Sequence, residues 1–363
     1  MTGMSDPRPL DEIRTEIDAV DADLVRLLSR RTELAIEVGL VKGRDGQPFF
    51  TPERERSVYE KLRRLNPGPL RDDQLIAIYR EVISAARASE QPMKVAYWGP
   101  EGTYSHYAST QVFGNSTTFV PKESILDVFM AVEHRLVDYG VVPVENSTAG
   151  VVPETLDGFP RTNVKICAER YVPIHHCLVS AAAGRKEVQR VYAGSQPLRQ
   201  CQAWLNTYLS GVEIVDAAPT ARAVAMAKND PHGAAIANRL AADLYDLPVL
   251  DEHIEDDPHN RTRFLVIGFN APARTGRDKT SLMFNLRNQP GELYRALGAL
   301  DRNQVNLLMI ESRPAPRSSF EYIFFCDCVG HRHDANVDQA MLDLKALTLE
   351  ITTLGSYPSD EQE

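Results

Sequence analysis

The sequence predicts a chain of three domains, the first all-α, the second α/β and the third α+β. Its 363 residues exceed the length of one ordinary domain, and 43% hydrophobic with 25% charged residues is a globular composition. Proline, glycine and small or polar residues indicate linkers at 89–92 and 270–278. We therefore expect domains at 1–91, 93–270 and 279–358.

Charge and cysteine content exclude several classes of protein. A net charge of -10 disfavours a nucleic-acid partner. No apolar run approaches the roughly 20 residues of a membrane span, and the first residues do not resemble a secretory signal. We expect a cytoplasmic protein without membrane contact. The five cysteines form no CxxC pair, which favours buried reduced thiols over disulfides or zinc, and we expect no cofactor and no metal.

The first domain shows helical periodicity. One helix of about 30 residues exceeds the usual length, so it should pack along another long helix, of this chain or of a second one. Its apolar positions are Ile13, Ile17, Val20, Leu24, Leu27, Leu28, Leu34, Val38 and Val41. A second helix begins at Pro52, with Thr51 as N-cap, and runs to about Leu65. The turn at 66–69 separates it from a third helix over 72–89.

The middle segment, about 94–269, alternates short strand-like runs with helical ones. The strand-like runs are 94–98, 139–144, 190–192, 234–237 and 263–267. This alternation is typical of an α/β domain whose helices cover a largely parallel sheet, with ligands held by loops at strand ends.

The last segment, about 280–357, has the element order β-α-β-β-α with a short closing strand near Ile351. Strands are expected at 281–286, 306–312 and 321–327, and helices at 293–301 and 337–348. This order suggests a small ferredoxin-like regulatory module. Cys326 and Cys328 share one strand face and should lie in its core.

Three basic residues interrupt the apolar pattern of the first helix. Arg31 and Lys42 lie about 20° apart around the axis and about 16 Å along it, so both can close on one small ligand. Arg14 lies about 25 Å from Arg31. If all three cations serve one site, Arg14 must come from a second chain. The alternative is ordinary solvated cations in helical ion pairs, such as Arg30 with Glu33.

Residues of about 10–91 resemble the all-helical, three-helix chorismate mutase domain, an intertwined dimer. The matching stretches are Ile13-Arg14, 30–35, 38–42, 53–56 and 78–84. The implied reaction is the Claisen rearrangement of chorismate to prephenate. It requires no nucleophile, so positioning and charge must carry the catalysis.

The resemblance implies a role for each matched mutase residue. Arg31 and a partner-derived Arg14 clamp the two carboxylates, and Lys42 faces the ether oxygen. Glu55 holds the ring hydroxyl, and Arg54 belongs to the same cluster.

Three positions of the mutase pattern depart from the family. Thr51 stands where Asp is frequent, Ala86 where Ser is frequent, and Glu90, followed by Gln91, where some members have Gln. A carboxylate cannot donate a hydrogen bond, so Glu90 must work protonated. Mutase activity is then expected to fall as pH rises through its pKa.

Three loops of the middle segment carry unusual polar residues. Residues 99–106 follow a strand and offer two glycines and several hydroxyls, 143–147 end a strand, and 260–264 begin one. Neither a GxGxxG pattern nor a Walker lysine is present, which disfavours a nucleotide ligand. Taken singly, each loop is a turn as readily as a ligand site.

Together and in this order, the loops resemble prephenate dehydratase over about 94–269, with Thr262-Arg263-Phe264 as the catalytic signature. The resemblance implies a two-lobed α/β fold, like periplasmic binding proteins, and loss of hydroxide and carbon dioxide from prephenate to give phenylpyruvate. Thr262 is implied as an oriented hydrogen-bond donor to the leaving hydroxyl, in a relay with water or Glu145. Arg263 fixes a carboxylate or else pairs structurally with an acid.

The resemblance implies further substrate-binding residues. They are Thr103, Ser105, Glu145, Asn146, Ser147, Gln200, Thr220, Arg263 and Phe264, together with Thr51 and Ala86 in the mutase domain. Ala193 departs from the family, which often has Ser there. His175 and His176, beside Cys177, point to opposite faces if they lie on a strand, which favours packing over metal binding.

Residues of about 280–357 resemble an ACT domain, with 291–294 and 311–314 as its two amino-acid-sensing motifs. The implied ligand is phenylalanine, bound between the ACT domains of two chains. The implied contacts are Gly291, Leu293, Glu311, Ser312, Arg313 and Pro314. Glu292 departs from the family, where Ala is usual.

The three resemblances together imply a bifunctional chorismate mutase and prephenate dehydratase under feedback regulation by phenylalanine, as a homodimer or a dimer of dimers. Two alternatives remain open from the residues. One is a dehydratase whose weak mutase domain serves mainly in dimerisation, and the other is a non-catalytic protein that binds small anions.

Overall fold

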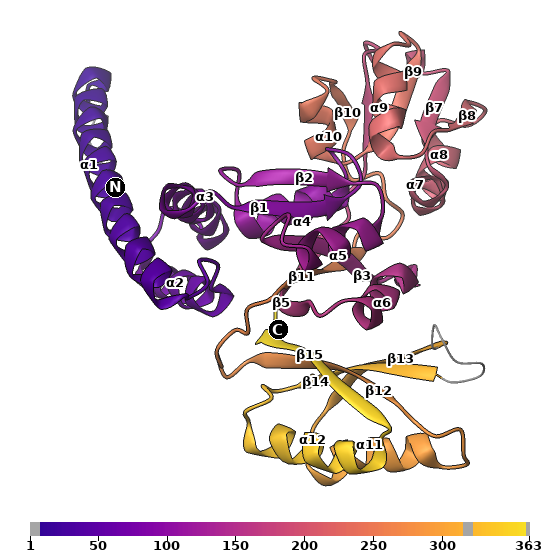
Figure 1. The fold of residues 1–363 in the computed structure, drawn as a ribbon. Helices are drawn as coiled ribbons and strands as arrows, with labels where there is room; N and C mark the ends of the chain where they lie inside the picture. The colour runs from indigo at the N-terminus through magenta and orange to yellow at the C-terminus, as the bar shows by residue number, and fades with distance from the viewer. Residues whose placement is uncertain (1–7, 315–321, 361–363) are drawn as a thin grey trace, which may run out of the picture. The chain divides into compact units, whose positions relative to one another are not determined.

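The computed structural model describes residues 8–314 and 322–360 (Figure 1). The chain forms two compact units, each considered by itself. The first comprises Met1–Phe50, Lys61–Met93 and Phe113–Thr117, and the second Thr51–Glu60, Lys94–Val112 and Thr118–Glu363. None of the helices in the described ranges is long and apolar enough to cross a membrane.

The three helices predicted at the N-terminus are confirmed as α1 (Leu10–Asp45), α2 (Pro52–Leu65) and α3 (Asp72–Glu90). At 36 residues α1 is longer than predicted, and it ends at Gly46, which takes the left-handed conformation that glycine tolerates. Helices α1 and α3 meet at Gly39, where a Cβ would lie 3.0 Å from the Glu90 Cβ. The absence of a side chain therefore permits this close approach.

The apolar stripe of α1 is left largely exposed in the single chain. Leu24 is 50% exposed and Leu28 41% exposed, near the middle of the helix. The exposed members of the predicted stripe are Ile17, Val20, Leu24, Leu27, Leu28, Leu34, Val38 and Val41. Such a contiguous apolar face marks an interaction surface.

The α/β region contains two sheets, which agrees with the predicted two-lobed fold. The first has strand order β2-β1-β3-β11-β5, with β4 paired to β3, and the second has order β10-β6-β9-β7-β8. The strands are β1 (Lys94–Trp98), β2 (Thr118–Lys122), β3 (Tyr139–Asn146), β4 (Gly150–Val151), β5 (Lys165–Pro173), β6 (Cys177–Ser180), β7 (Arg190–Ala193), β8 (Glu213–Asp216), β9 (Gly233–Ala237), β10 (Val249–Asp251) and β11 (Arg261–Gly268).

Short helices connect these strands. They are α4 (Tyr104–Phe113), α5 (Ile125–Glu133), α6 (Pro153–Gly158), η1 (Phe159–Arg161), η2 (Arg185–Glu187), α7 (Ser195–Gln200), α8 (Gln202–Tyr208), α9 (Thr220–Lys228) and α10 (Arg239–Leu244). The expectation of a largely parallel sheet is wrong, because β11 runs antiparallel to both β3 and β5. In the chain, β11 follows the strands of the second sheet, and it lies in the first sheet between β3 and β5.

The C-terminal region confirms the predicted α+β order. It consists of β12 (Asp278–Asn285), α11 (Glu292–Arg302), β13 (Leu307–Pro314), β14 (Tyr322–Val329), α12 (Ala335–Leu347) and β15 (Glu350–Pro358). The sheet has order β13-β14-β12-β15, and the closing strand is nine residues long instead of short. Glu321, the first residue of one predicted strand, lies outside the described residues.

The two faces of the C-terminal sheet have different neighbours. Helices α11 and α12 cover one face (Figure 1), where Cys326 and Cys328 lie in the core as predicted. Strand β15 packs beside β5 so closely that a Cβ at Gly355 would overlap the Ile166 carbonyl oxygen. All five cysteines are buried and free, as expected.

Candidate active sites

In the first unit, Glu90 on α3 lies within electrostatic reach of basic residues on α1. Burial raises the pKa of Glu90 above its ordinary value, against the opposing charges of Lys42, Arg87 and Arg31. Lys42 Nζ also donates to the Phe49 carbonyl at 3.3 Å. This unit therefore gathers two of the predicted cations around a carboxyl group that is biased toward its protonated form.

Arg14 is distant from this cluster along the same helix. Its side chain is 66% exposed, and its Nη1 lies 3.8 Å from Asp11 Oδ1 in the same turn. Ala86 is buried on α3 one turn before Glu90.

The remaining predicted mutase residues lie on segment 51–60, which belongs to the second unit. The Thr51 carbonyl accepts hydrogen bonds from the backbone N–H groups of Arg54 and Glu55, so Thr51 lies at the start of α2 as predicted.

In the second unit, Asn146 and Thr262 face each other across the β3–β11 ladder. Asn146 Nδ2 donates to Thr262 Oγ1 at 2.9 Å and to Asn260 Oδ1 at 2.8 Å. Ser147 Oγ accepts from the Arg261 N–H at 3.0 Å. The ends of two neighbouring strands thus bring the predicted Asn146, Ser147 and Thr262 together.

The orientation of the Asn146 amide follows from its partners. Its Oδ1 accepts from the backbone N–H groups of Thr148, at 3.1 Å, and Ala149, at 2.9 Å, which can only donate. The Nδ2 must then point toward Thr262. A hydroxyl has one proton to donate, so Thr262 accepts from Asn146 and keeps its own proton for another partner.

Gln200, at the end of α7, reaches this group of side chains from the region of the second sheet. Its Nε2 donates to Thr148 Oγ1 at 3.3 Å, and His176 Nε2 lies 2.9 Å from its Oε1. Burial lowers the pKa of His176, which favours its neutral form and makes Nε2 the donor to Gln200. His176 therefore orients Gln200.

Asn260 is a member of this group that was not singled out from the sequence. It is 2% exposed, and its Nδ2 has no hydrogen-bond partner within residues 8–314 and 322–360. A buried donor without a partner is costly, so this amide is suited to a ligand oxygen. Its position two residues before Thr262 was the available signal.

Several predicted residues do not join this group. Thr103 Oγ1 accepts from the His106 N–H at 3.3 Å, so it caps α4. Ser105 is buried on the same helix, and Thr220 begins α9. Phe264 is 1% exposed.

Arg263 does not join them either, although it follows Thr262 directly. Its side chain is 4% exposed and pairs with Glu169 and Asp327. Of the two roles left open for Arg263, the structural partner of an acid is the one that these contacts support. The prediction that it fixes a substrate carboxylate is wrong for this conformation, because a strand turns successive side chains to opposite faces.

His175 and His176 lie in a loop between β5 and β6, and the expectation of a strand there is wrong because β5 ends at Pro173. His175 Nδ1 lies 2.7 Å from Glu255 Oε1, and His253 Nδ1 lies 3.4 Å from the same atom. These three side chains are close enough to hold a metal ion. Burial raises the pKa of Glu255, but hydrogen bonds from His175 and the His176 N–H outweigh it and lower the pKa.

The two predicted ligand motifs of the C-terminal domain lie on different elements. Gly291, with a φ of 81°, precedes α11, on which Leu293 lies. Residues 311–314 end β13, and Arg313 donates from Nε and Nη2 to the Asp157 carboxylate at 3.1 and 2.9 Å. The second motif is therefore tied to α6 of the α/β region.

Comparison with protein families matches each region to a different model. Residues 13–91 match chorismate mutase type II, residues 95–272 match prephenate dehydratase, and residues 280–346 match the ACT domain. A bifunctional chorismate mutase/prephenate dehydratase of Aquifex aeolicus (strain VF5) is 42% identical over 96% of this chain and 98% of its own length. The chain belongs to the bifunctional chorismate mutase/prephenate dehydratase family. The enzyme therefore carries a mutase and a dehydratase activity on one chain, followed by an ACT domain.

Solved structures are similar to about three quarters of the enzyme. A prephenate dehydratase from Arthrobacter aurescens, crystallised with L-Phe, is 32% identical, with a TM-score of 0.70 over 74% of this chain and 91% of its own. A protein described as a quorum-quenching acylase, GqqA, is 27% identical, with a TM-score of 0.68 over 74% of this chain and 98% of its own.

Proposed function

We propose that Thr262 donates a hydrogen bond to the hydroxyl group that leaves prephenate. Loss of carbon dioxide supplies the electron pair that makes the ring aromatic, so the protein must chiefly stabilise charge on the departing oxygen. The supporting observation is the 2.9 Å hydrogen bond from Asn146 Nδ2 to Thr262 Oγ1. It occupies an acceptor position on Thr262 and leaves the hydroxyl proton available to substrate.

Three neighbours of Thr262 complete this proposed site. Asn260 Nδ2, which has no hydrogen-bond partner in the described part of the chain, would hold oxygen atoms of the substrate together with the side chains of Ser147 and Gln200. Glu145 precedes Asn146 on β3, and its backbone lies opposite that of Arg263 in the β3–β11 ladder. Its part in a proton relay stays a prediction.

Replacing Thr262 by Ala and by Ser tests the dehydratase proposal. Thr262→Ala should lower dehydratase kcat on the order of 10²- to 10³-fold, as expected for loss of one donor to a developing charge. Thr262→Ser keeps the hydroxyl and should retain most of the rate. Phenylpyruvate formation from prephenate is the measurement, and mutase activity on the same chain controls for folding. Equal loss in both variants would contradict the role of the hydroxyl.

For the mutase we propose that Arg31, Lys42 and Glu90 act with Arg14 of the partner subunit in a homodimer built along α1. The exposed apolar stripe of α1 and the solvent-exposed Arg14 support this arrangement. Lys42 and a protonated Glu90 would face the ether oxygen of chorismate, where negative charge develops. A dimer of dimers and a cytoplasmic location stay predictions.

We further propose that the ACT domain binds phenylalanine as a feedback effector. The similar Arthrobacter aurescens enzyme was crystallised with L-Phe. In this chain, residues 291–294 and 311–314 resemble the amino-acid-sensing motifs of ACT domains. Isothermal titration of the enzyme with phenylalanine tests binding directly.

A further inference from the structure

On the face of β11 opposite to Thr262 lies a buried ion cluster centred on Arg263. Thr262 and Arg263 are neighbours in a strand, so their side chains point to opposite sides of the sheet. Leu265, two residues further on, packs in one core with Phe325 and Leu354 of the ACT domain. One strand therefore presents Thr262 to the dehydratase site and Arg263 to the ACT domain.

The guanidinium of Arg263 uses all three of its nitrogen atoms. Its Nε donates to Glu169 Oε2 on β5 at 2.7 Å. Its Nη1 donates to Asp327 Oδ2 on β14 at 2.5 Å, and its Nη2 donates to the Tyr357 hydroxyl on β15 at 2.9 Å. Two of the three bonds thus reach the ACT domain. Burial lowers the pKa of Arg263, but the acidic groups around it outweigh burial and raise the pKa, so Arg263 stays charged.

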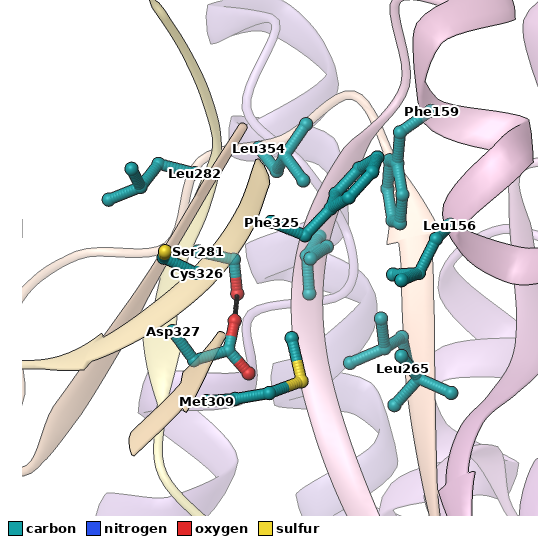
Figure 2. Close-up of a pocket in the computed structure, with 12 residues that line it drawn as sticks. Leu156, Phe159, Leu265, Ser281, Leu282, Met309, Phe325, Cys326, Asp327 and Leu354 are labelled. Carbon is teal, nitrogen blue, oxygen red and sulfur yellow. Dashed lines mark hydrogen bonds between the residues drawn. The ribbon is translucent and has the colours of Figure 1, made fainter. Parts of the chain in front are cut away.

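Strand β12 supplies further partners for Asp327, Tyr357 and Glu169, the three groups that accept hydrogen bonds from Arg263. Ser281 Oγ donates to Asp327 Oδ1 at 2.5 Å, the bond drawn in Figure 2, and lies 2.6 Å from the Tyr357 hydroxyl. Lys279 Nζ lies 3.1 Å from Glu169 Oε1. Two cations and two carboxylates therefore balance inside the protein, and loss of one partner would leave an uncompensated buried charge.

Apolar packing beside the cluster leaves little room for independent movement of the two sheets. Figure 2 shows Leu156, Phe159 and Leu265 of the dehydratase region on one side of a narrow pocket, with Phe325, Leu354 and Met309 of the ACT domain facing them. Packed interfaces of this kind shift between discrete arrangements instead of deforming gradually. A displacement of β14 must therefore be taken up by the bonds of Arg263.

A short physical path leads from the second ACT motif to this cluster. In the β13–β14 ladder, Glu311 pairs with Phe325 and Met309 pairs with Asp327. The strand that carries residues 311–314 is thus hydrogen-bonded to the strand that carries Asp327. From Asp327 one ion pair reaches Arg263, and one peptide bond separates Arg263 from Thr262.

We propose that Arg263 is a positioning residue through which the ACT domain controls the place of Thr262 in the dehydratase site. Phenylalanine bound to the ACT domain displaces β14 and thereby alters the ion pair between Asp327 and Arg263. The backbone of β11 then moves Thr262 in the dehydratase site. The inference rests on the proposed roles of Thr262 and of phenylalanine. It adds the route between them, which is a buried ion pair across the two domains.

Asp327→Asn is the sharpest test, because it keeps the shape and one acceptor oxygen but removes the charge. Phenylalanine binding is titrated with and without phenylpyruvate, the dehydratase product. The ratio of the two dissociation constants is the coupling factor between the sites, typically about 5 to 150. We expect the factor to approach 1 in Asp327→Asn, with phenylalanine still bound. We also expect dehydratase kcat to fall several-fold while KM changes little.

Asp157→Asn provides a matched control. It makes the same substitution in another arginine–carboxylate pair between the two domains, the pair of Asp157 on α6 with Arg313 on β13. For each variant, the dissociation constant of phenylalanine with phenylpyruvate is compared with that variant's own constant without phenylpyruvate. A change in phenylalanine affinity that is the same in both titrations therefore cancels. The coupling factor and kcat of Asp157→Asn should match those of the parent enzyme.

Milder variants decide the question if Asp327→Asn does not fold. Tyr357→Phe and Ser281→Ala retain all four charges, and at least one should show partial loss of coupling. A folded Asp327→Asn with parental coupling and kcat overturns the proposal, as do parental values in both milder variants.

If the parent enzyme binds no phenylalanine, that titration contradicts the effector proposal, and the proposed route through Arg263 is contradicted with it. If Thr262→Ala keeps dehydratase activity, the site assignment fails although the coupling factor stays measurable.

Discussion

The dehydratase region joins Thr262 and Asn146 by a hydrogen bond inside one chain, whereas the mutase region leaves Arg14 exposed and far along α1 from Arg31. Thr262 is 9% exposed and Arg14 66% exposed. One site is assembled by the fold of a single chain. In the mutase region of a single chain, Arg14 lies apart from the other predicted cations and the apolar stripe of α1 is exposed.

Geometry explains the difference between the two regions. The ends of neighbouring strands lie side by side at one edge of a sheet. Residues more than a hundred positions apart in the chain, such as Asn146 and Thr262, therefore become direct neighbours. A straight helix separates its residues by about 1.5 Å each, so Arg14 and Arg31 stay about 25 Å apart. Two cations that far apart on one straight helix cannot contact the same small ligand, which is why we propose that Arg14 comes from a second chain.

The largest expected effect separates a shared site from a self-contained one. Arg14→Ala and Arg31→Ala should each lower mutase activity on the order of 10²-fold or more, because each removes a clamp on a substrate carboxylate. When the two variants are co-expressed, half of the randomly formed dimers are mixed, and each mixed dimer has one intact site. About one quarter of the parental mutase activity should therefore return. Chorismate consumption is the measurement.

The matched control uses two dehydratase variants. Co-expression of Thr262→Ala with Asn146→Asp should restore no dehydratase activity beyond that of the separate variants, because both residues lie in one chain. Recovery in this pair, or its absence in the arginine pair, would reverse the comparison.

The second effect concerns the bond between Asn146 and Thr262. Asn146→Asp keeps the acceptor for Thr148 and Ala149 but replaces the donor by a carboxylate oxygen. That oxygen attracts the Thr262 proton away from substrate, so dehydratase kcat should fall roughly 10- to 100-fold with little change in KM. Initial rates over a range of prephenate concentrations provide the measurement. An unchanged kcat would show that the orientation of the Thr262 hydroxyl is unimportant.

The sequence predicted elements best where local signals were strong. Pro52 after Thr51 marked the start of α2, and the apolar run at 94–98 coincides with β1. Direction and pairing were harder, because no local signal shows that β11 returns to the first sheet after the second sheet has formed. The loop at His175 was mistaken for a strand, although Pro173 was the available sign that β5 ends.

The candidate sites show the same limit. The motif at 262–264 marks β11, the strand on which we place the proposed role of Thr262. A motif groups neighbouring residues together, whereas a strand points successive side chains to opposite faces. Period-two alternation was enough to predict that Thr262 and Arg263 cannot face the same ligand. The partners of Arg263 were beyond prediction, because Asp327 and Tyr357 belong to another domain and meet Arg263 only through tertiary packing.

The smallest expected effect distinguishes the two activities by pH. Burial raises the pKa of Glu90 despite Lys42, Arg87 and Arg31, so its protonated, hydrogen-bond-donating form persists to higher pH. Above that pKa Glu90 becomes an anion beside the oxygen where negative charge develops. Mutase kcat should then fall up to about tenfold per pH unit. Glu90→Gln donates at every pH and should flatten the mutase profile, while the dehydratase profile of the same protein stays parental. A mutase profile that keeps its slope in Glu90→Gln would assign the titration to another group.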